Sequence, residues 1–100
     1  MKVTFNQSGG FAGLVKGCEL DTATLAPDAA RELERLIRGS GLSSSVKRLS
    51  DTARDLHQYE ITIEDSDGKV ELLFDDSTVP QSASPLLGFL KKHTRPKPLV

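Results

Sequence analysis

The chain has 100 residues, the size of one domain with a single hydrophobic core. Its apolar share of 37%, its charged share of 27% and its net charge of −1 are typical of a soluble globular protein. A charge this close to zero provides no overall field to attract nucleic acid or an anionic membrane, and no stretch approaches the ~20 apolar residues of a membrane span. Neither nucleic acid nor a membrane is therefore an expected partner.

The start of the chain lacks the pattern of a secretion signal, because Lys2 is followed by alternating polar residues up to Gly9. A single cysteine, Cys18, excludes an intramolecular disulfide. The sequence therefore predicts a cytoplasmic protein in which Cys18 is a small buried hydrophobe rather than a nucleophile.

Two strands are predicted within Val3–Asp21. Val3 and Phe5 alternate with polar residues, and Cys18 and Leu20 share one parity further on, as in a half-buried hairpin.

The loop between these strands, Ser8–Gly13, has an unusual composition. Its glycines permit positive φ angles and close approach of the backbone to another group. Phe11 lies among them, where turns ordinarily carry Asn, Asp or Ser. Phe11 therefore either folds back onto the core or is offered to a partner.

A helix is predicted over Asp28–Arg38, with its apolar side chains on one face and Pro27 in its first turn. Gly39-Ser40-Gly41 is expected to end it. Leu42–His57 has no clear periodicity and is interpreted as a long connection.

A second hairpin is predicted from two alternating runs, Tyr59–Glu64 and Val70–Asp75, around the turn Asp65–Gly68. Ser84-Pro85 is typical of a helix N-cap and first turn, and the apolar residues that follow predict a helix ending near His93.

The fold class that follows is α+β: a four-stranded antiparallel sheet in the order ββα-ββα, with both helices packed on one face. Residues 1–93 are predicted to form a single domain, and residues 94–100 a flexible C-terminal tail.

No catalytic constellation can be assembled from these residues. His57 and His93 are far apart and neither has a partner at metal-ligand spacing, so no metal site and no cofactor are predicted. The glycine loop leads into a strand rather than a helix and lacks the Lys-Ser/Thr ending of a phosphate-binding loop. The sequence therefore predicts a binding protein and not an enzyme.

Two binding surfaces remain open at this point. A loop held by paired strands loses little entropy on binding, and Phe11 or Leu14 would provide an apolar anchor. The alternative is a protein-interaction module that presents the acidic face of the sheet, with Glu60, Glu64 and Glu71, to a basic partner.

The residues also resemble a known family. Met1–Phe5, Ser8–Leu14 and Glu19–Thr22 look like the emfourin family, small proteins described as inhibitors of thermolysin-like, specifically protealysin-like, zinc metallopeptidases. The resemblance continues through Glu32–Leu36, Gln58–Tyr59, Asp75–Asp76, Val79–Pro80 and Pro85–Leu87. Two features depart from the family pattern. Cys18 replaces an expected aliphatic residue. Ser43–Asp55 is richer in serine and in charged residues than the connection expected in the family, which contains proline and aromatic residues.

The resemblance implies a proteinaceous inhibitor that occupies the active-site cleft of a thermolysin-like zinc metallopeptidase. Separately, we expect the chain to be a monomer when free. We expect the loop of the first hairpin to enter that cleft, with Phe11 or Leu14 in an apolar specificity pocket. Steric exclusion of substrate would suffice, without a ligand from the inhibitor to the zinc. The expected peptidase-binding residues are Ser8, Gly9, Gly10, Phe11, Ala12, Gly13 and Leu14.

Overall fold

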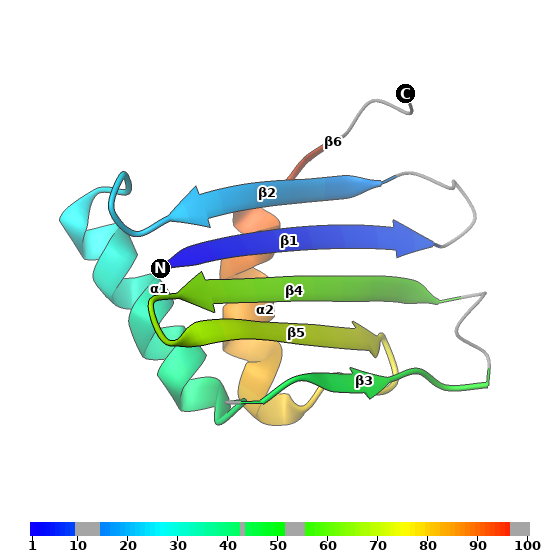
Figure 1. Ribbon diagram of the computed structural model, residues 1–100. Helices are drawn as coiled ribbons and strands as arrows, with labels where there is room; N and C mark the ends of the chain where they lie inside the picture. Colours follow the sequence, from blue (N-terminus) through cyan, green and yellow to red (C-terminus); the bar gives the residue numbers. More distant parts are fainter. Residues whose placement is uncertain (10–14, 43, 52–55, 97–100) are drawn as a thin grey trace.

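The computed structural model describes residues 1–9, 15–42, 44–51 and 56–96. One sheet of six strands, in the order β3-β5-β4-β1-β2-β6, carries two helices on one face (Figure 1). The strands are β1 (Lys2–Gly9), β2 (Lys16–Asp21), β3 (Val46–Arg48), β4 (His57–Asp65), β5 (Gly68–Asp75) and β6 (Arg95–Pro96). The helices are α1 (Pro27–Ser40) and α2 (Ser84–Lys92), and the short 3-10 helix η2 (Gln81–Ala83) precedes α2.

Both predicted hairpins are confirmed. β1 and β2 pair antiparallel, as do β4 and β5. The β4–β5 turn is two residues long, and Asp65 Oδ1 accepts hydrogen bonds from the N–H groups of Asp67 at 2.8 Å and Gly68 at 3.1 Å. This Asx-type turn is what the cluster of Asp, Ser and Gly predicts.

The two hairpins are joined by antiparallel pairing of β1 with β4, which runs from Lys2↔Glu64 to Gly9↔His57. This register places the alternating apolar residues of four strands on the same face, for example Phe5 beside both Cys18 and Ile61. Because side chains alternate along a strand, one face becomes apolar and the other polar.

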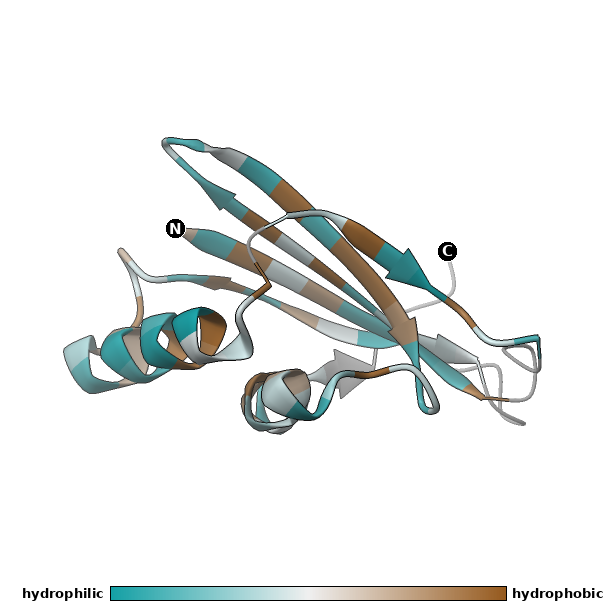
Figure 2. Cartoon of the chain, turned by 90° about the horizontal axis from the view of Figure 1, so that it is seen from below, coloured by the Kyte–Doolittle hydropathy of each residue, from teal (hydrophilic) through white to brown (hydrophobic). Residues whose placement is uncertain are grey.

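The two helices cover the apolar face, and Figure 2 shows both on the same side of the sheet. Leu33 of α1 and Leu86 and Leu90 of α2 are fully buried. They join a core that also includes Val3, Phe5, Leu20, Tyr59, Ile61, Ile63, Leu72, Phe74 and Leu87. The opposite face of the sheet, which we call the open face, has no helix on it among the described residues.

The prediction of a four-stranded antiparallel sheet is correct for β1, β2, β4 and β5 but wrong for the edges. β3 pairs parallel with β5, which makes the sheet mixed, and β6 pairs with the start of β2. β3 lies inside the stretch interpreted as a connection, Leu42–His57. Val46 is its single apolar residue, so its three residues carry no recognisable alternation, and its pairing depends on the exposed edge of β5.

The ends of the helices also differ slightly from expectation. α1 continues through Gly39 and Ser40, and Gly41 is the C-cap, in the left-handed region at φ 68°. Ser84 is a helical residue rather than the N-cap, because η2 runs directly into α2. In the predicted tail, Arg95 and Pro96 pair with β2, and residues 97–100 lie outside the described part of the chain.

Leu33→Ala should strongly destabilise the fold, because it empties a fully buried site between α1 and the sheet. We expect a loss of about 2–5 kcal/mol in the free energy of unfolding, measured by urea denaturation. Leu49→Ala is the control: Leu49 is 37% exposed, so a change below about 0.5 kcal/mol is expected. Equal losses in the two variants would contradict the assignment of the core.

Candidate functional site

The predicted binding loop begins at the end of β1. Ser8 and Gly9 are the last two residues of that strand and pair with Gln58 and His57 of β4. Gly10, Phe11, Ala12, Gly13 and Leu14 lie outside the described residues. Their role therefore stays a prediction, and the structure shows how the start of the loop is held.

Gly9 is fixed by its own chain. Its φ is 90°, a value that L side chains rarely adopt, and a Cβ added there would lie 2.6 Å from the carbonyl oxygen of Leu56. The sequence predicts close approach of the glycine backbone to another group. For Gly9 that group is Leu56, the residue just before β4. The fold itself therefore requires glycine at position 9, whether or not the loop binds a partner.

Several segments meet at this end of the sheet, which we call the loop end. Because β1 runs antiparallel to β4 and β4 antiparallel to β5, the end of β1, the start of β4 and the end of β5 lie together (Figure 1). Gly9 pairs with His57, and Gln7 pairs with Lys16. The start of β2 therefore also lies at the loop end.

A polar network around Asp76 joins β4 to the turn after β5. The buried Tyr59 donates its hydroxyl hydrogen bond to Asp76 Oδ1, and the N–H of His57 donates to Asp76 Oδ2 at 2.9 Å. His57 Nδ1 lies 3.4 Å from the same oxygen. Lys91 of α2 lies 4.8 Å above the Tyr59 ring centroid, with its Nζ 3.4 Å from the hydroxyl.

These contacts change the acidity of both partners. Burial raises the pKa of Tyr59, and the hydrogen bond to Asp76 raises it further, because the carboxylate favours the protonated phenol. Burial alone would raise the pKa of Asp76, but the donors from Tyr59 and His57 outweigh it and lower that pKa. The network therefore fixes the start of β4 with a charged carboxylate and a neutral phenol.

Asp75 forms a second and fully buried anchor. Its Oδ2 accepts from the N–H of Ser50 at 2.6 Å and from the Ser50 hydroxyl at 2.8 Å. Its Oδ1 accepts from the N–H of Ser77 at 2.8 Å and from the Ser77 hydroxyl at 2.7 Å. Burial would raise the pKa of Asp75, yet these four donors lower it below its ordinary value.

Sequence reasoning missed these roles of Asp75 and Asp76. The two aspartates stand at a strand end before Ser77 and Thr78, a composition that favours side-chain bonds to nearby backbone N–H groups. That signal indicates the turn after β5. It does not indicate Ser50, which is 25 residues away and reaches Asp75 only through the tertiary fold.

No group of three or more His, Cys, Asp or Glu side chains within 1–9, 15–42, 44–51 and 56–96 could hold a metal ion. His93 Nδ1 lies 2.9 Å from the carbonyl oxygen of Phe89, and half-buried Cys18 faces α2, with Sγ 3.7 Å from the Leu90 carbonyl oxygen. Within the same ranges, neither helix is long and apolar enough to cross a membrane.

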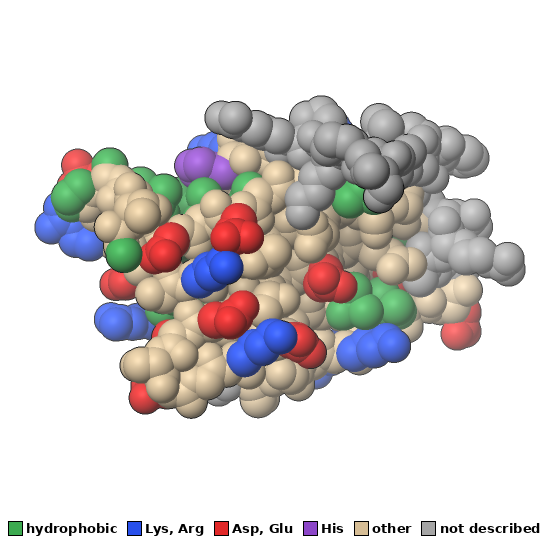
Figure 3. Space-filling model, turned by 45° about the horizontal axis from the view of Figure 1, so that its top comes forward, with side chains coloured by type: hydrophobic (Ala, Val, Ile, Leu, Met, Phe, Trp, Pro, Cys, Tyr) green, Lys and Arg blue, Asp and Glu red, His purple; other side chains and the backbone are tan. Residues whose placement is uncertain are grey.

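The open face is mixed in charge rather than uniformly acidic. Lys2 pairs with Glu19 at 3.1 Å, and Lys69 pairs with Glu71 at 3.2 Å. Figure 3 shows acidic and basic side chains intermingled on this side of the molecule. A groove of about 380 Å³ lies on the β3 side of this face, lined by Ser45, Val46, Lys47, Glu60, Thr62, Glu71, Leu72 and Leu73. The lysines weaken the case for this face as a purely acidic docking surface.

Comparison with known families decides the relationship of the chain. The sequence model of the emfourin family matches residues 5–91, which covers most of the chain and the whole of the predicted loop.

The chain belongs to the emfourin family. The resemblance predicted from Ser8–Leu14 and its companion motifs is thus confirmed. Searches of curated proteins and of solved structures give no significant match. The emfourin match includes β1 from Phe5 onward, the rest of the first hairpin, the whole second hairpin, Asp75 and Asp76, so the loop end described above belongs to the matched region.

Gly9→Ala should destabilise the loop end, because the added Cβ collides with the Leu56 carbonyl and the φ of 90° is unfavourable for alanine. We expect a loss of about 1–3 kcal/mol in the free energy of unfolding, measured by urea denaturation. Gly39→Ala in α1 is the matched control, with nothing within 4 Å of the added Cβ, and should stabilise by about 0.4–1 kcal/mol. Wild-type stability of Gly9→Ala would contradict the described backbone.

Acid should destabilise the protein through Asp75 and Asp76. Their folded pKa values are lowered relative to the ~3.9 of an unfolded aspartate, so the unfolded chain takes up protons first. The stability that these groups provide is therefore fully present above about pH 5 and is lost as the pH falls through the folded pKa values.

Asp75→Asn tests this dependence by urea denaturation from pH 7 to pH 2. The amide has one acceptor oxygen where the carboxylate has two, so stability at pH 7 should fall and the loss on acidification should become shallower. Asp67→Asn, at an exposed position of the β4–β5 turn, is the control and should keep the wild-type profile. An unchanged profile in Asp75→Asn would refute the role of this carboxylate.

Proposed function

We propose that the chain inhibits thermolysin-like zinc metallopeptidases of the protealysin-like kind by blocking their active-site cleft with Ser8–Leu14. The observation that carries this proposal is the emfourin match over residues 5–91, which includes every residue of the loop. The inhibitor acts as a binding protein, and the zinc belongs to the peptidase.

The described geometry supports a loop of this kind. Its first residues are part of β1, which pairs on both sides, with β2 and with β4. Gly9 is held against Leu56, and His57 beside it is bonded to Asp76. A segment that leaves a rigid support loses less entropy on binding than a free peptide, which favours tight inhibition.

The proposed mechanism is occupation of the substrate's place. Glycine-rich backbone pairs with the cleft strand of the peptidase as an extended substrate does. Phe11 or Leu14 fills the apolar pocket that thermolysin-like enzymes use for the residue after the scissile bond. Substrate is excluded sterically, and no side chain of the inhibitor is needed as a zinc ligand. A cytoplasmic location and a monomeric free state stay predictions from the sequence.

Titration of purified thermolysin-like and protealysin-like peptidases with the wild-type protein and Phe11→Ala tests the proposal. Wild type should abolish activity near one equivalent, and Phe11→Ala should weaken inhibition at least tenfold, or about 1.4 kcal/mol, by removing an apolar anchor. Failure to inhibit any such peptidase would refute the function. Undiminished inhibition by Phe11→Ala would keep the function and move the anchor elsewhere.

The triple variant Glu60→Gln, Glu64→Gln and Glu71→Gln separates this proposal from the alternative. These side chains project from the open face and lie outside the proposed loop. Inhibition should remain within about twofold of wild type. A large loss in the triple variant, together with strong salt sensitivity, would favour the acidic face as the binding surface.

A further inference from the structure

β3 is a short edge strand with side-chain hydrogen bonds at both of its ends. Ser45 Oγ accepts from the N–H of Glu71 at 3.0 Å just before the strand. Thr78 Oγ1 donates to the carbonyl oxygen of Arg48 at 2.6 Å at its end. Just beyond it, Ser50 donates twice to the buried carboxylate of Asp75. Hydrogen bonds from β5 and from the turn after it thus hold the segment that contains β3.

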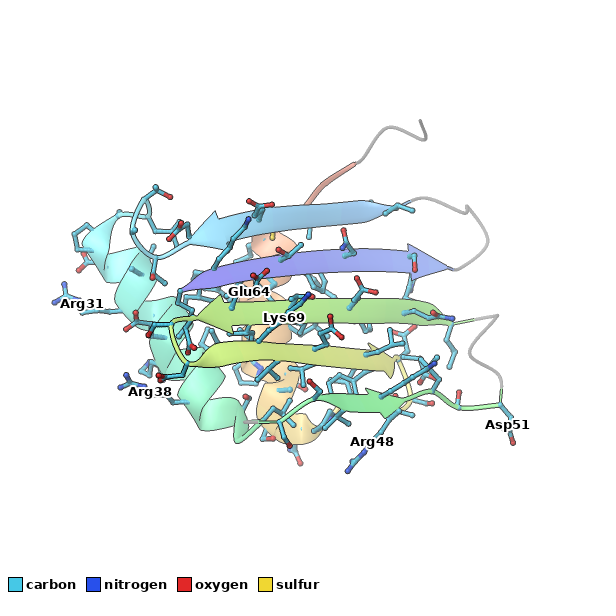
Figure 4. All side chains as sticks on the ribbon, in the orientation of Figure 1. Arg31, Arg38, Arg48, Asp51, Glu64 and Lys69 are labelled. Atoms are coloured by element: carbon cyan, nitrogen blue, oxygen red, sulfur yellow. The ribbon has the colours of Figure 1, made fainter. Side chains whose placement is uncertain are left out.

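The residues displayed by this strand combine cationic and apolar character. Lys47 and Arg48 are exposed, and Figure 4 shows the Arg48 side chain pointing away from the sheet. Leu49 follows directly and, at 37%, is the exposed large hydrophobic side chain of the described part of the chain. We call Lys47, Arg48 and Leu49 the β3 edge.

The cations of the β3 edge lack an acidic partner among the described residues. The ion pairs of residues 1–9, 15–42, 44–51 and 56–96 include neither of them, and Glu71, which lines the same groove as Lys47, pairs with Lys69. Asp51, the nearest acidic residue in the sequence, extends further out at the loop end (Figure 4). A lysine on an edge strand commonly prevents self-association, but that role does not account for Leu49.

The backbone of the β3 edge can also accept a partner. The carbonyl of Arg48 accepts from Thr78, which comes from the β5 side. Because backbone groups alternate along a strand, those of Lys47 point to the outer edge. An extended segment can therefore add beside β3 through Lys47.

We propose that the β3 edge is a second docking surface, on which an extended acidic segment of the inhibited peptidase binds. Lys47 and Arg48 lie on opposite faces of the strand, so two successive carboxylates of such a segment would meet one cation each. Leu49 would contact an apolar neighbour of those carboxylates. This inference rests on the proposed function. It adds a physical reason why the inhibitor would bind one peptidase more tightly than another.

The two surfaces are close enough for one partner. Three strand spacings of ~4.8 Å separate β1 from β3, so the β3 edge lies about 14 Å from the strand that carries the loop. β3 runs parallel to β5, and Arg48 and Leu49 therefore approach the loop end. A standard interface of ~800 Å² per partner is roughly 30 Å across and covers both.

Charge reversal at the β3 edge tests the inference. Lys47→Glu with Arg48→Glu should weaken inhibition of the titrated peptidase at least tenfold, and added salt should partly restore it, because attraction to acidic groups becomes a repulsion that salt screens. Arg38→Glu with Lys92→Glu is the matched control, with the same change in net charge at exposed helical positions. It should stay within about twofold. Thermal melting of both double variants shows whether they fold, and Lys47→Gln with Arg48→Gln provides a milder second test.

The outcomes separate the two proposals. Wild-type inhibition by both β3-edge double variants would overturn the second surface and leave the inhibitory function intact. Equal losses of inhibition in the β3-edge variant and in the control would show that the effect comes from net charge alone. That result would also overturn the second surface. Absence of inhibition by the wild-type protein would overturn both proposals together.

Discussion

The pairing of β1 with β4 is the contact on which the rest of the structure depends. Each hairpin is local and pairs with itself across a short connection, but neither buries a face alone. The β1–β4 ladder joins them through eight residue pairs that are about 55 residues apart in the chain. It aligns the apolar parity of both hairpins, and a slip of one residue would turn half of that surface to solvent.

The same ladder determines what the two helices do. Once the four central strands share one apolar face, α1 and α2 have a common surface to cover, and Leu33, Leu86 and Leu90 become fully buried on it. The open face stays polar, with lysines paired to glutamates. The fold therefore separates a two-layer body from its ends, and the two proposed binding surfaces lie at the loop end and at the sheet edge.

Polar groups, rather than apolar ones, organise the loop end. Asp75 is fully buried and accepts four hydrogen bonds, and Asp76 binds Tyr59 and His57. A buried carboxylate is unfavourable unless its donors are complete, so each network admits one arrangement of its segment. In this way a chain with a modest core holds the start of β4, the end of β5 and Ser50 in one geometry. The proposed inhibitory loop leaves from that support.

The sequence by itself determined the two hairpins, the two helices and their order, because alternation and helical periodicity are local properties of the chain. The sequence also determined the emfourin relationship, since the family match over residues 5–91 needs only the order of residues. The Asp65–Gly68 turn and the helix end at Gly41 followed from the preferences of Asp and Gly.

Only the tertiary structure decided the edges of the sheet and the anchors of the loop end. β3 has one apolar residue in three, so its strand exists because β5 offers an unpaired edge and Asp75 binds Ser50 beyond it. The need for glycine at position 9 arises from the carbonyl of Leu56, 47 residues further along the chain. No local pattern contains these contacts, because each joins residues that are far apart in the sequence and meet only in the tertiary fold.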